Sequence, residues 1–228
     1  PIGVFGSLVW VLDRFVRKTY TCTWMAQLDN VPHFGASGRS VERAVWSAAA
    51  IAEWSVCAGR KASTFLLDIS KAFENIEHPL LLEAAKDHKF SLLVMRWLLC
   101  LYQSDRVLVF QEVLSKVVRA SRSVVPGSSH ADLCMKLMLL TPLMGCRAHF
   151  PTVQLSCLVD AVQDLAHGPD AIAVAKLAAE AAQYLVDVMQ NVCLLPISVA
   201  KLCVAASSPE VGLSIVQRSL LLRRSLAK

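Results

Sequence analysis

The chain has 228 residues, a formal net charge of +5 and a hydrophobic fraction of 55%. This length can bury a sizeable core, in one domain or in two lobes that share a core. The mean hydropathy of +0.48 is high for a soluble domain. The most apolar windows, 91–102 and 133–146, nevertheless fall short of the roughly 20 residues that a membrane span needs. We therefore exclude a membrane span and expect both windows to form core helices.

The cysteines and the basic residues give weaker indications. All eight cysteines are singletons without a C-x-x-C pair, which argues against a zinc site and favours a reducing compartment. The basic residues gather in four short clusters: Arg14, Arg17 and Lys18; Arg39 and Arg43; Lys116, Arg119 and Arg122; and Arg218, Arg223, Arg224 and Lys228. Such clusters can follow a phosphate backbone, although ordinary solvated faces are the commoner explanation from charge alone.

Hydrophobic spacing, capping residues and turn residues predict a mixed order of helices and strands. In the first half we expect an amphipathic helix over 4–18, a loop over 30–39, a helix over 41–56 capped by Ser40, a strand ending at Asp68, and helices over 79–88 and 91–102. In the second half we expect a hairpin within 106–125, a helix over 131–140, a hairpin within 152–163, a helix over 171–190, a strand over 201–205 and a basic helical tail from Val211.

The most informative stretch is 65–78, FLLDISKAFENIEH. It predicts a short apolar strand that carries one carboxylate, Asp68, at its end, and then a turn into a helix opened by Pro79. An aspartate at the end of a buried strand is costly unless a metal ion or a cation meets it. A turn or helix-capping aspartate is the ordinary alternative for an isolated residue of this kind.

A second strand repeats the arrangement. Alternating apolar residues over 153–159 predict a strand of a hairpin whose tip carries Asp160. Strand ends that are distant in the chain can be neighbours in an antiparallel sheet, and paired carboxylates there can hold Mg²⁺ together with substrate phosphates. Two such ions can clamp an in-line phosphoryl transfer. A glycine-serine turn over 124–129 opens a helix between the two strands; its amides could approach a phosphate, but a plain loop is the commoner explanation.

Seven short blocks, in order and at the right spacing, resemble the reverse transcriptase domain of non-LTR (LINE-like) retrotransposons, which is related to group II intron reverse transcriptases. The blocks are 1–2 with 12–15, 34–40, 65–78, 101–107 with the following hairpin, 125–129, 158–160, and Pro196 with 201–207. Each block is weak alone, but together they cover nearly the whole chain.

The resemblance implies RNA-directed DNA polymerisation by an α+β right-hand fold, in which helices flank an antiparallel palm sheet. Partial, helix-rich fingers would cover 1–60, the palm 61–207, and a basic helical tail 208–228 would lead toward a missing thumb. The implied partners are an RNA template, a DNA primer, deoxynucleoside triphosphates and the remainder of a longer mobile-element polyprotein, with no membrane. The implied location is intracellular, with the nucleus as one candidate.

The resemblance also assigns roles to individual residues. Asp68 and Asp160 would be the catalytic carboxylates that bind two Mg²⁺ ions, and the carbonyl of Ile69 would help to hold one ion. Phe73 would lie under the sugar of the incoming nucleotide and exclude a 2′-hydroxyl. The further candidates are Arg39 for template or triphosphate, Gly127 and Ser128 for template and nucleotide, and Lys201 for the leaving pyrophosphate.

Departures from the family pattern predict weakened catalysis. Ala161 stands where the second catalytic motif has a second aspartate, Pro126 replaces the usual glutamine, and Asp164 is not expected to substitute. Because the chain begins at Pro1 without a Met and stops before a full thumb, we expect a truncated or decayed copy. Two alternatives stay open: a nucleic-acid-binding remnant without catalysis, and an unrelated helical protein with no sheet around Asp68.

Overall fold

The computed structural model describes residues 7–26, 40–105, 107, 109–111 and 113–219. The chain divides into two compact units: unit 1 comprises 1–27 and 71–138, and unit 2 comprises 28–70 and 139–228. Helix α6 (Ala131–His149) begins in unit 1 and ends in unit 2. Within the described ranges, no helix has the length and apolarity needed to cross a membrane. The boundaries of fingers, palm and tail stay predictions.

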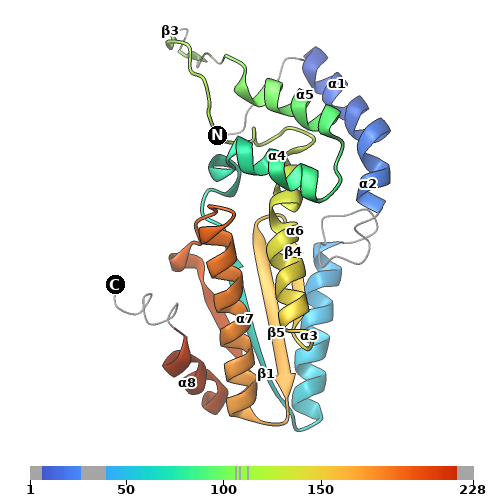
Figure 1. Cartoon of the computed structure of the whole chain (residues 1–228). Coiled ribbons are helices and arrows are strands. Elements are labelled where there is room, and N and C mark those ends of the chain that lie inside the picture. The colour runs from blue at the N-terminus through green and yellow to red at the C-terminus, as the bar shows by residue number, and fades with distance from the viewer. Residues whose placement is uncertain (1–6, 27–39, 106, 108, 112, 220–228) are drawn as a thin grey trace. The chain divides into compact units, whose positions relative to one another are not determined.

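Unit 2 is built on a four-stranded antiparallel sheet in the order β4-β5-β1-β6 (Figure 1). The strands are β1 (Lys61–Asp68), β4 (Gln154–Leu158), β5 (Ala161–Gly168) and β6 (Cys203–Ala206). Along β1 the faces alternate, because Phe65 and Leu67 are buried whereas Leu66 between them is 42% exposed. Burial of each large side chain contributes about 1.5–3 kcal/mol to folding. The antiparallel sheet is confirmed, and the alternative of a helical protein without a sheet at Asp68 is wrong.

Three further helices belong to unit 2: α3 (Val41–Cys57), α7 (Ala171–Asn191) and α8 (Pro209–Arg218). Helix α7 packs on β1 and β5 through a buried face rich in alanine, and small side chains allow close approach to the sheet. Two predicted starts are confirmed by their caps. Ser40 accepts a hydrogen bond from the Arg43 amide at 3.2 Å, and Asp170 accepts one from the Ala173 amide at 2.7 Å.

Unit 1 is mainly helical. Its elements are α1 (Ser7–Val16), the π-helical turn η1 (Arg17–Thr21), α2 (Cys22–Ala26), the 3-10 turn η2 (Ala72–Asn75), α4 (His78–Asp87), α5 (Leu92–Gln103), and the short strands β2 (Val109–Phe110) and β3 (Val113–Leu114). Trp24 ties α2 to the end of α4, because its indole donates to the His88 carbonyl at 2.8 Å and its ring packs edge-on against Phe90.

Several predicted boundaries differ from the structure. The first helix changes into a π-helical turn at Arg17, and α6 continues through Pro142 to His149 rather than ending at 140. The hairpin within 106–125 has strands of only two residues, and both residues of β3, Val113 and Leu114, lie exposed. Lys201 lies in the 3-10 turn η3 (Val199–Lys201), and the last strand starts at Cys203.

Candidate active site

The two predicted carboxylates meet at one rim of the unit 2 sheet. Asp68, the last residue of β1, pairs directly with Ala161, the first residue of β5. The Ile69 amide donates a hydrogen bond of 3.1 Å to the carbonyl of Asp160, which precedes Ala161 in the turn. Paired residues of an antiparallel ladder project to the same face, so Asp68 and Ala161 are cross-strand neighbours.

The turn that carries Asp160 has a strained backbone. Strands β4 and β5 are joined by only two residues, Val159 and Asp160, and Val159 has φ +55°. A positive φ at the first position suits a tight hairpin, which normally places glycine there. For a β-branched residue this conformation costs about 1–3 kcal/mol. Strain of this kind is typical of functional sites, and here it lies immediately before the second candidate carboxylate.

Lys201 contacts Asp68 from the segment that follows Pro196. The segment around Pro196 runs beside β1, because the Ser70 amide donates to the Pro196 carbonyl at 2.7 Å and the Ser198 amide donates to the Asp68 carbonyl at 2.8 Å. The turn that follows places Lys201 Nζ 2.9 Å from Asp68 Oδ2. This oxygen is buried and accepts no other well-aligned hydrogen bond within the described part of the chain. Hydrogen bonding to Asp68 raises the pKa of Lys201.

The electrostatics of Asp160 reflect its half-buried position beside a second acid. Burial raises the pKa of this carboxyl, and the charge of Asp68 raises it further. A hydrogen bond to its own backbone and the charge of Lys201 oppose these effects without cancelling them. Two neighbouring carboxylates also suit a divalent cation, because a bound cation offsets the repulsion between their charges.

These donors fit one Mg²⁺ ion but not a complete two-ion site. The carboxylates of Asp68 and Asp160, with the Ile69 carbonyl, are hard oxygen ligands of the kind that Mg²⁺ takes together with water and phosphate. The buried Asp68 oxygen is suited to a cation, since it already faces an ammonium group. Ala161 supplies no side-chain ligand, and the described residues contain no group of three or more acidic, histidine or cysteine side chains that could hold a metal ion.

The other predicted site residues belong elsewhere. Phe73, Gly127 and Ser128 lie in unit 1, whereas Asp68, Asp160, Ile69 and Lys201 lie in unit 2. Arg39 lies outside the described residues. Within unit 1, the half-buried Phe73 is tied to the segment before the glycine-serine turn, because its carbonyl accepts a hydrogen bond of 2.8 Å from the Val124 amide.

Asp164 cannot replace the missing carboxylate. It pairs with Phe65, so it projects to the buried face of the sheet, opposite to the face of Asp68. There it accepts a hydrogen bond of 3.4 Å from the Phe65 amide, and its Oδ2 has no partner within the described residues. Burial raises the pKa of Asp164 well above its ordinary value.

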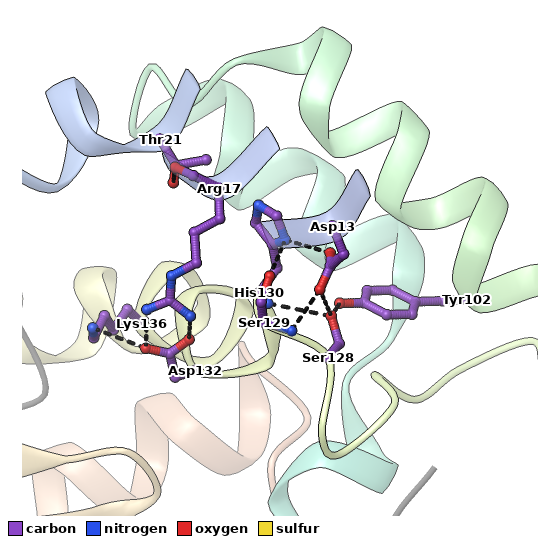
Figure 2. Close-up of polar contacts among 9 residues, drawn as sticks. All are labelled: Asp13, Arg17, Thr21, Tyr102, Ser128, Ser129, His130, Asp132 and Lys136. Atoms are coloured by element: carbon purple, nitrogen blue, oxygen red, sulfur yellow. Dashed lines mark hydrogen bonds and ion pairs between the residues drawn. The ribbon is translucent and has the colours of Figure 1, made fainter. Parts of the chain in front are cut away.

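A buried polar network around Asp13 was not predicted. Asp13 Oδ1 lies 2.6 Å from His130 Nδ1, and Asp13 Oδ2 accepts the Ser129 amide at 2.6 Å (Figure 2). Ser128 Oγ lies 2.9 Å from the Tyr102 hydroxyl. These residues do not form a Ser-His-Asp triad, because the Ser129 hydroxyl and the Asp13 carboxylate both contact Nδ1 of His130 rather than opposite ring nitrogens. The network anchors the 127–130 turn to α1. The signal for it was a single aspartate between Val9 and Val16 on the inner face of the first helix.

Comparisons with known proteins show the fold. No protein-family model and no curated protein matches the sequence. A chain of apo telomerase from Candida tropicalis, truncated from its C-terminal domain, matches 90% of this chain and 45% of its own length, with a TM-score of 0.60 and 10% identity. Telomerase from Candida albicans, solved in complex with the TWJ fragment of telomeric RNA, matches 89% of this chain and 34% of its own length, with a TM-score of 0.57 and 11% identity.

The chain therefore has a reverse-transcriptase-like fold, of the kind seen in telomerase. It spans less than half of the length of these telomerase chains. At such low identity the likeness shows the fold alone.

Proposed function

We propose that the chain is the fingers and palm part of an RNA-directed DNA polymerase from a mobile element, and that its catalysis is weakened. The observation that carries the proposal is the pairing of Asp68 with Ala161, next to Asp160, at one rim of an antiparallel sheet. The reverse-transcriptase-like fold supports it. The substrates would be an RNA template, a DNA primer and deoxynucleoside triphosphates.

Asp68 and Asp160, with the Ile69 carbonyl, would hold Mg²⁺, which when bound neutralises developing charge on phosphate oxygens. Lys201 keeps a proton at Nζ next to Asp68, where its charge favours a phosphate leaving group. Because Ala161 has no carboxylate, the sheet face on which Asp68 lies lacks one metal ligand. Loss of such a ligand weakens metal binding and misorients the remaining donors.

A second candidate function follows from the same substitution. A chain that lacks one carboxylate would retain nucleic-acid binding while nucleotide addition falls below detection. It predicts salt-dependent binding to an RNA/DNA hybrid without primer extension.

The test is primer extension on an RNA template with Mg²⁺, comparing the natural chain with Ala161→Asp. The new carboxylate would lie opposite Asp68, so we expect extension to rise by about 10–100-fold. Adding Asp68→Asn to this variant should abolish the gain, whereas adding the exposed Asp170→Asn should not. If Ala161→Asp stays inactive while folded and bound to the hybrid, the polymerase proposal is wrong and the binding remnant is favoured.

A further inference from the structure

Helix α1 exposes its apolar side to solvent and buries an acid. Four of its apolar residues have the i, i+3, i+4, i+7 spacing of one helix face and are between 46% and 74% exposed: Leu8, Val11, Leu12 and Phe15. The only buried residue of α1 is Asp13. An amphipathic helix normally turns the other way, with its apolar face toward the core. A row of exposed apolar side chains at this spacing is typical of a helix that docks on a partner.

The orientation of α1 is fixed by the buried network around Asp13. This carboxylate accepts the Ser129 amide at 2.6 Å and lies 2.6 Å from Nδ1 of His130 (Figure 2). A rotation of α1 that buried its apolar side would leave the Ser129 amide and the buried His130 without their acceptor. The row of Leu8, Val11, Leu12 and Phe15, which we call the α1 stripe, therefore stays exposed.

The α1 stripe has a basic border. Arg14 and Lys18 are exposed, lie four residues apart and have no acidic partner within the described part of the chain. Arg17 differs from them, because two hydrogen bonds hold its guanidinium on Asp132. A second α1 stripe would bring like charges against Arg14 and Lys18. The surface that covers this stripe should therefore be apolar, with acidic residues beside it.

Helix α3, in unit 2, offers a surface of this kind. Val45, Ala52 and Val56 are spaced i, i+7 and i+11 on one helix face, and the two valines are 59% and 53% exposed. We call these three residues the α3 stripe. Glu42 and Glu53 lie along one border of it, eleven residues apart. Both are exposed, and neither has a basic partner among the residues that the structure describes.

The α3 stripe leads into an apolar cavity of about 450 Å³, which is lined by residues of α3, β1 and the β6 region. Apart from Glu53, every lining side chain is a valine or smaller, and four of them are alanines: Ala52, Ala62, Ala205 and Ala206. Such a lining has room for a large apolar side chain from outside, and burial of that side chain would stabilise the contact. A cation beside the entering side chain would meet Glu53.

We propose that the α1 stripe of one copy of the chain docks on the α3 stripe of a second copy, with Phe15 in the cavity and Arg14 facing Glu53. Both stripes are exposed, so both are accessible to a second copy. Of the possible pairings, only α1 with α3 matches apolar with apolar and basic with acidic, because like stripes bring like charges together. The contact joins two different surfaces, so it can be made twice in a closed dimer or repeat from copy to copy.

The test is analytical ultracentrifugation of the full chain over a range of concentrations. Arg14→Glu with Lys18→Glu reverses the charge of the α1 border, and Glu42→Lys with Glu53→Lys reverses that of the α3 border. We expect each variant alone to self-associate at least about tenfold more weakly than the natural chain. An equal mixture of the two variants should associate again, because each reversed border then meets its opposite on the other variant.

Two matched controls separate the stripes from the rest of the surface. Lys86→Glu with Lys89→Glu makes the same change of net charge as the α1 variant, at exposed positions outside both stripes, and should leave association unchanged. Phe15→Ser should weaken association about tenfold or more, because it empties the cavity. Leu213→Ser, at a leucine of α8 that is 66% exposed, should have no effect.

Three results would overturn the proposal. The first is a natural chain that stays monomeric up to about 0.5 mM, where even weak interfaces associate. The second is a mixture of the two border variants that associates no better than either variant alone. The third is binding of a monomeric natural chain to vesicles that contain phosphatidylserine, lost in Phe15→Ser, which would assign the α1 stripe to a membrane surface. None of these measurements involves Asp68 or Asp160, so the polymerase proposal stands or fails separately.

Discussion

The Nζ atom of Lys201 lies 2.9 Å from Oδ2 of Asp68, so an ammonium group of the chain meets the carboxylate that we assign to Mg²⁺. Lys201 itself is largely exposed, whereas the oxygen that it contacts is buried. The lysine can therefore leave toward solvent, but the carboxylate depends on some cation for compensation. In this arrangement the lysine and a bound metal ion would compete for one oxygen.

We expect Lys201→Met to bind a divalent cation about 3- to 10-fold more tightly, because the ammonium group that competes for the Asp68 carboxylate is removed. Isothermal titration with Mg²⁺, or the spectrum of bound Mn²⁺, measures this without any turnover. Lys176→Met is the matched control, since its lysine pairs with Glu180 on an exposed helix face. Unchanged or weaker binding in Lys201→Met would contradict the competition.

The buried Asp164 should make stability depend on pH. Its folded pKa lies well above the ordinary value of 3.8, chiefly because of burial, so the folded state keeps a proton that the unfolded state has lost. Its contribution to the free energy of unfolding is therefore largest at low pH and falls by about 1.4 kcal/mol per pH unit between the two values. Relative to Asp164→Asn, the natural chain should lose stability as pH rises through this window.

Urea unfolding at several pH values measures the difference. Asp170→Asn is the control, because asparagine also caps a helix and the carboxylate at Asp170 is exposed. A difference between Asp164→Asn and the natural chain that does not change with pH would show that Asp164 titrates normally.

Because Gly145 of α6 lies against Tyr184 of α7, the effect of Gly145→Ala on the free energy of unfolding should change sign when Tyr184 is removed. A Cβ atom at this position would overlap the Tyr184 hydroxyl, and the Tyr184 ring packs against the rings of His149 and Phe150. Gly145→Ala gains about 1 kcal/mol of helix propensity but pays about 1–3 kcal/mol of overpacking, so we expect a net loss. In a Tyr184→Ala background the same change should stabilise the chain. Thermal unfolding of the four combinations gives the coupling, and its absence would contradict the contact.

Local signals in the sequence were sufficient for the strands that end near Asp68 and Asp160, whereas the neighbourhood of these two ends was expected from the family resemblance. An apolar run that ends in a carboxylate is a local signal, and the alternation of Val153, Leu155 and Cys157 indicated which residues face inward, although Val159 lies in the turn. Ser40 and Asp170 mark helix starts for the same reason, because a cap acts on the three residues after it. The strands and helix caps need no information from distant parts of the chain.

The ion pair of Lys201 and the burial of Asp13 were beyond such local reasoning. Lys201 meets Asp68 only because the segment at Pro196 lies beside β1, which is a consequence of tertiary packing. Asp13 is buried because partners more than a hundred residues away satisfy both of its oxygens. A polar residue on an apolar helix face indicates that some partner exists, but it does not identify the partner.

Replacement of Asp13 by asparagine tests whether this network supports unit 1. Burial raises the pKa of Asp13, but hydrogen bonds from His130 and Ser129 outweigh this effect, so the folded pKa lies below the ordinary value of 3.8. The contribution of Asp13 is thus fully present above 3.8 and is lost as pH falls through the folded value. We expect Asp13→Asn to lower the free energy of unfolding by about 2–4 kcal/mol at neutral pH. The asparagine NH₂ group would face one of the two groups, His130 and the Ser129 amide, that now donate to the carboxylate.

The loss of stability in Asp13→Asn should be smaller at acidic pH, because protonation of Asp13 also removes the stabilising carboxylate from the natural chain. Urea unfolding from neutral pH to about pH 3 follows the change. Asp105→Asn provides the contrast: its carboxylate is exposed and pairs with Arg119 at the surface, where an ion pair contributes little to stability. If both variants lost the same stability at every pH, Asp13 would act as an ordinary surface acid, and the turn at 127–130 would need another anchor.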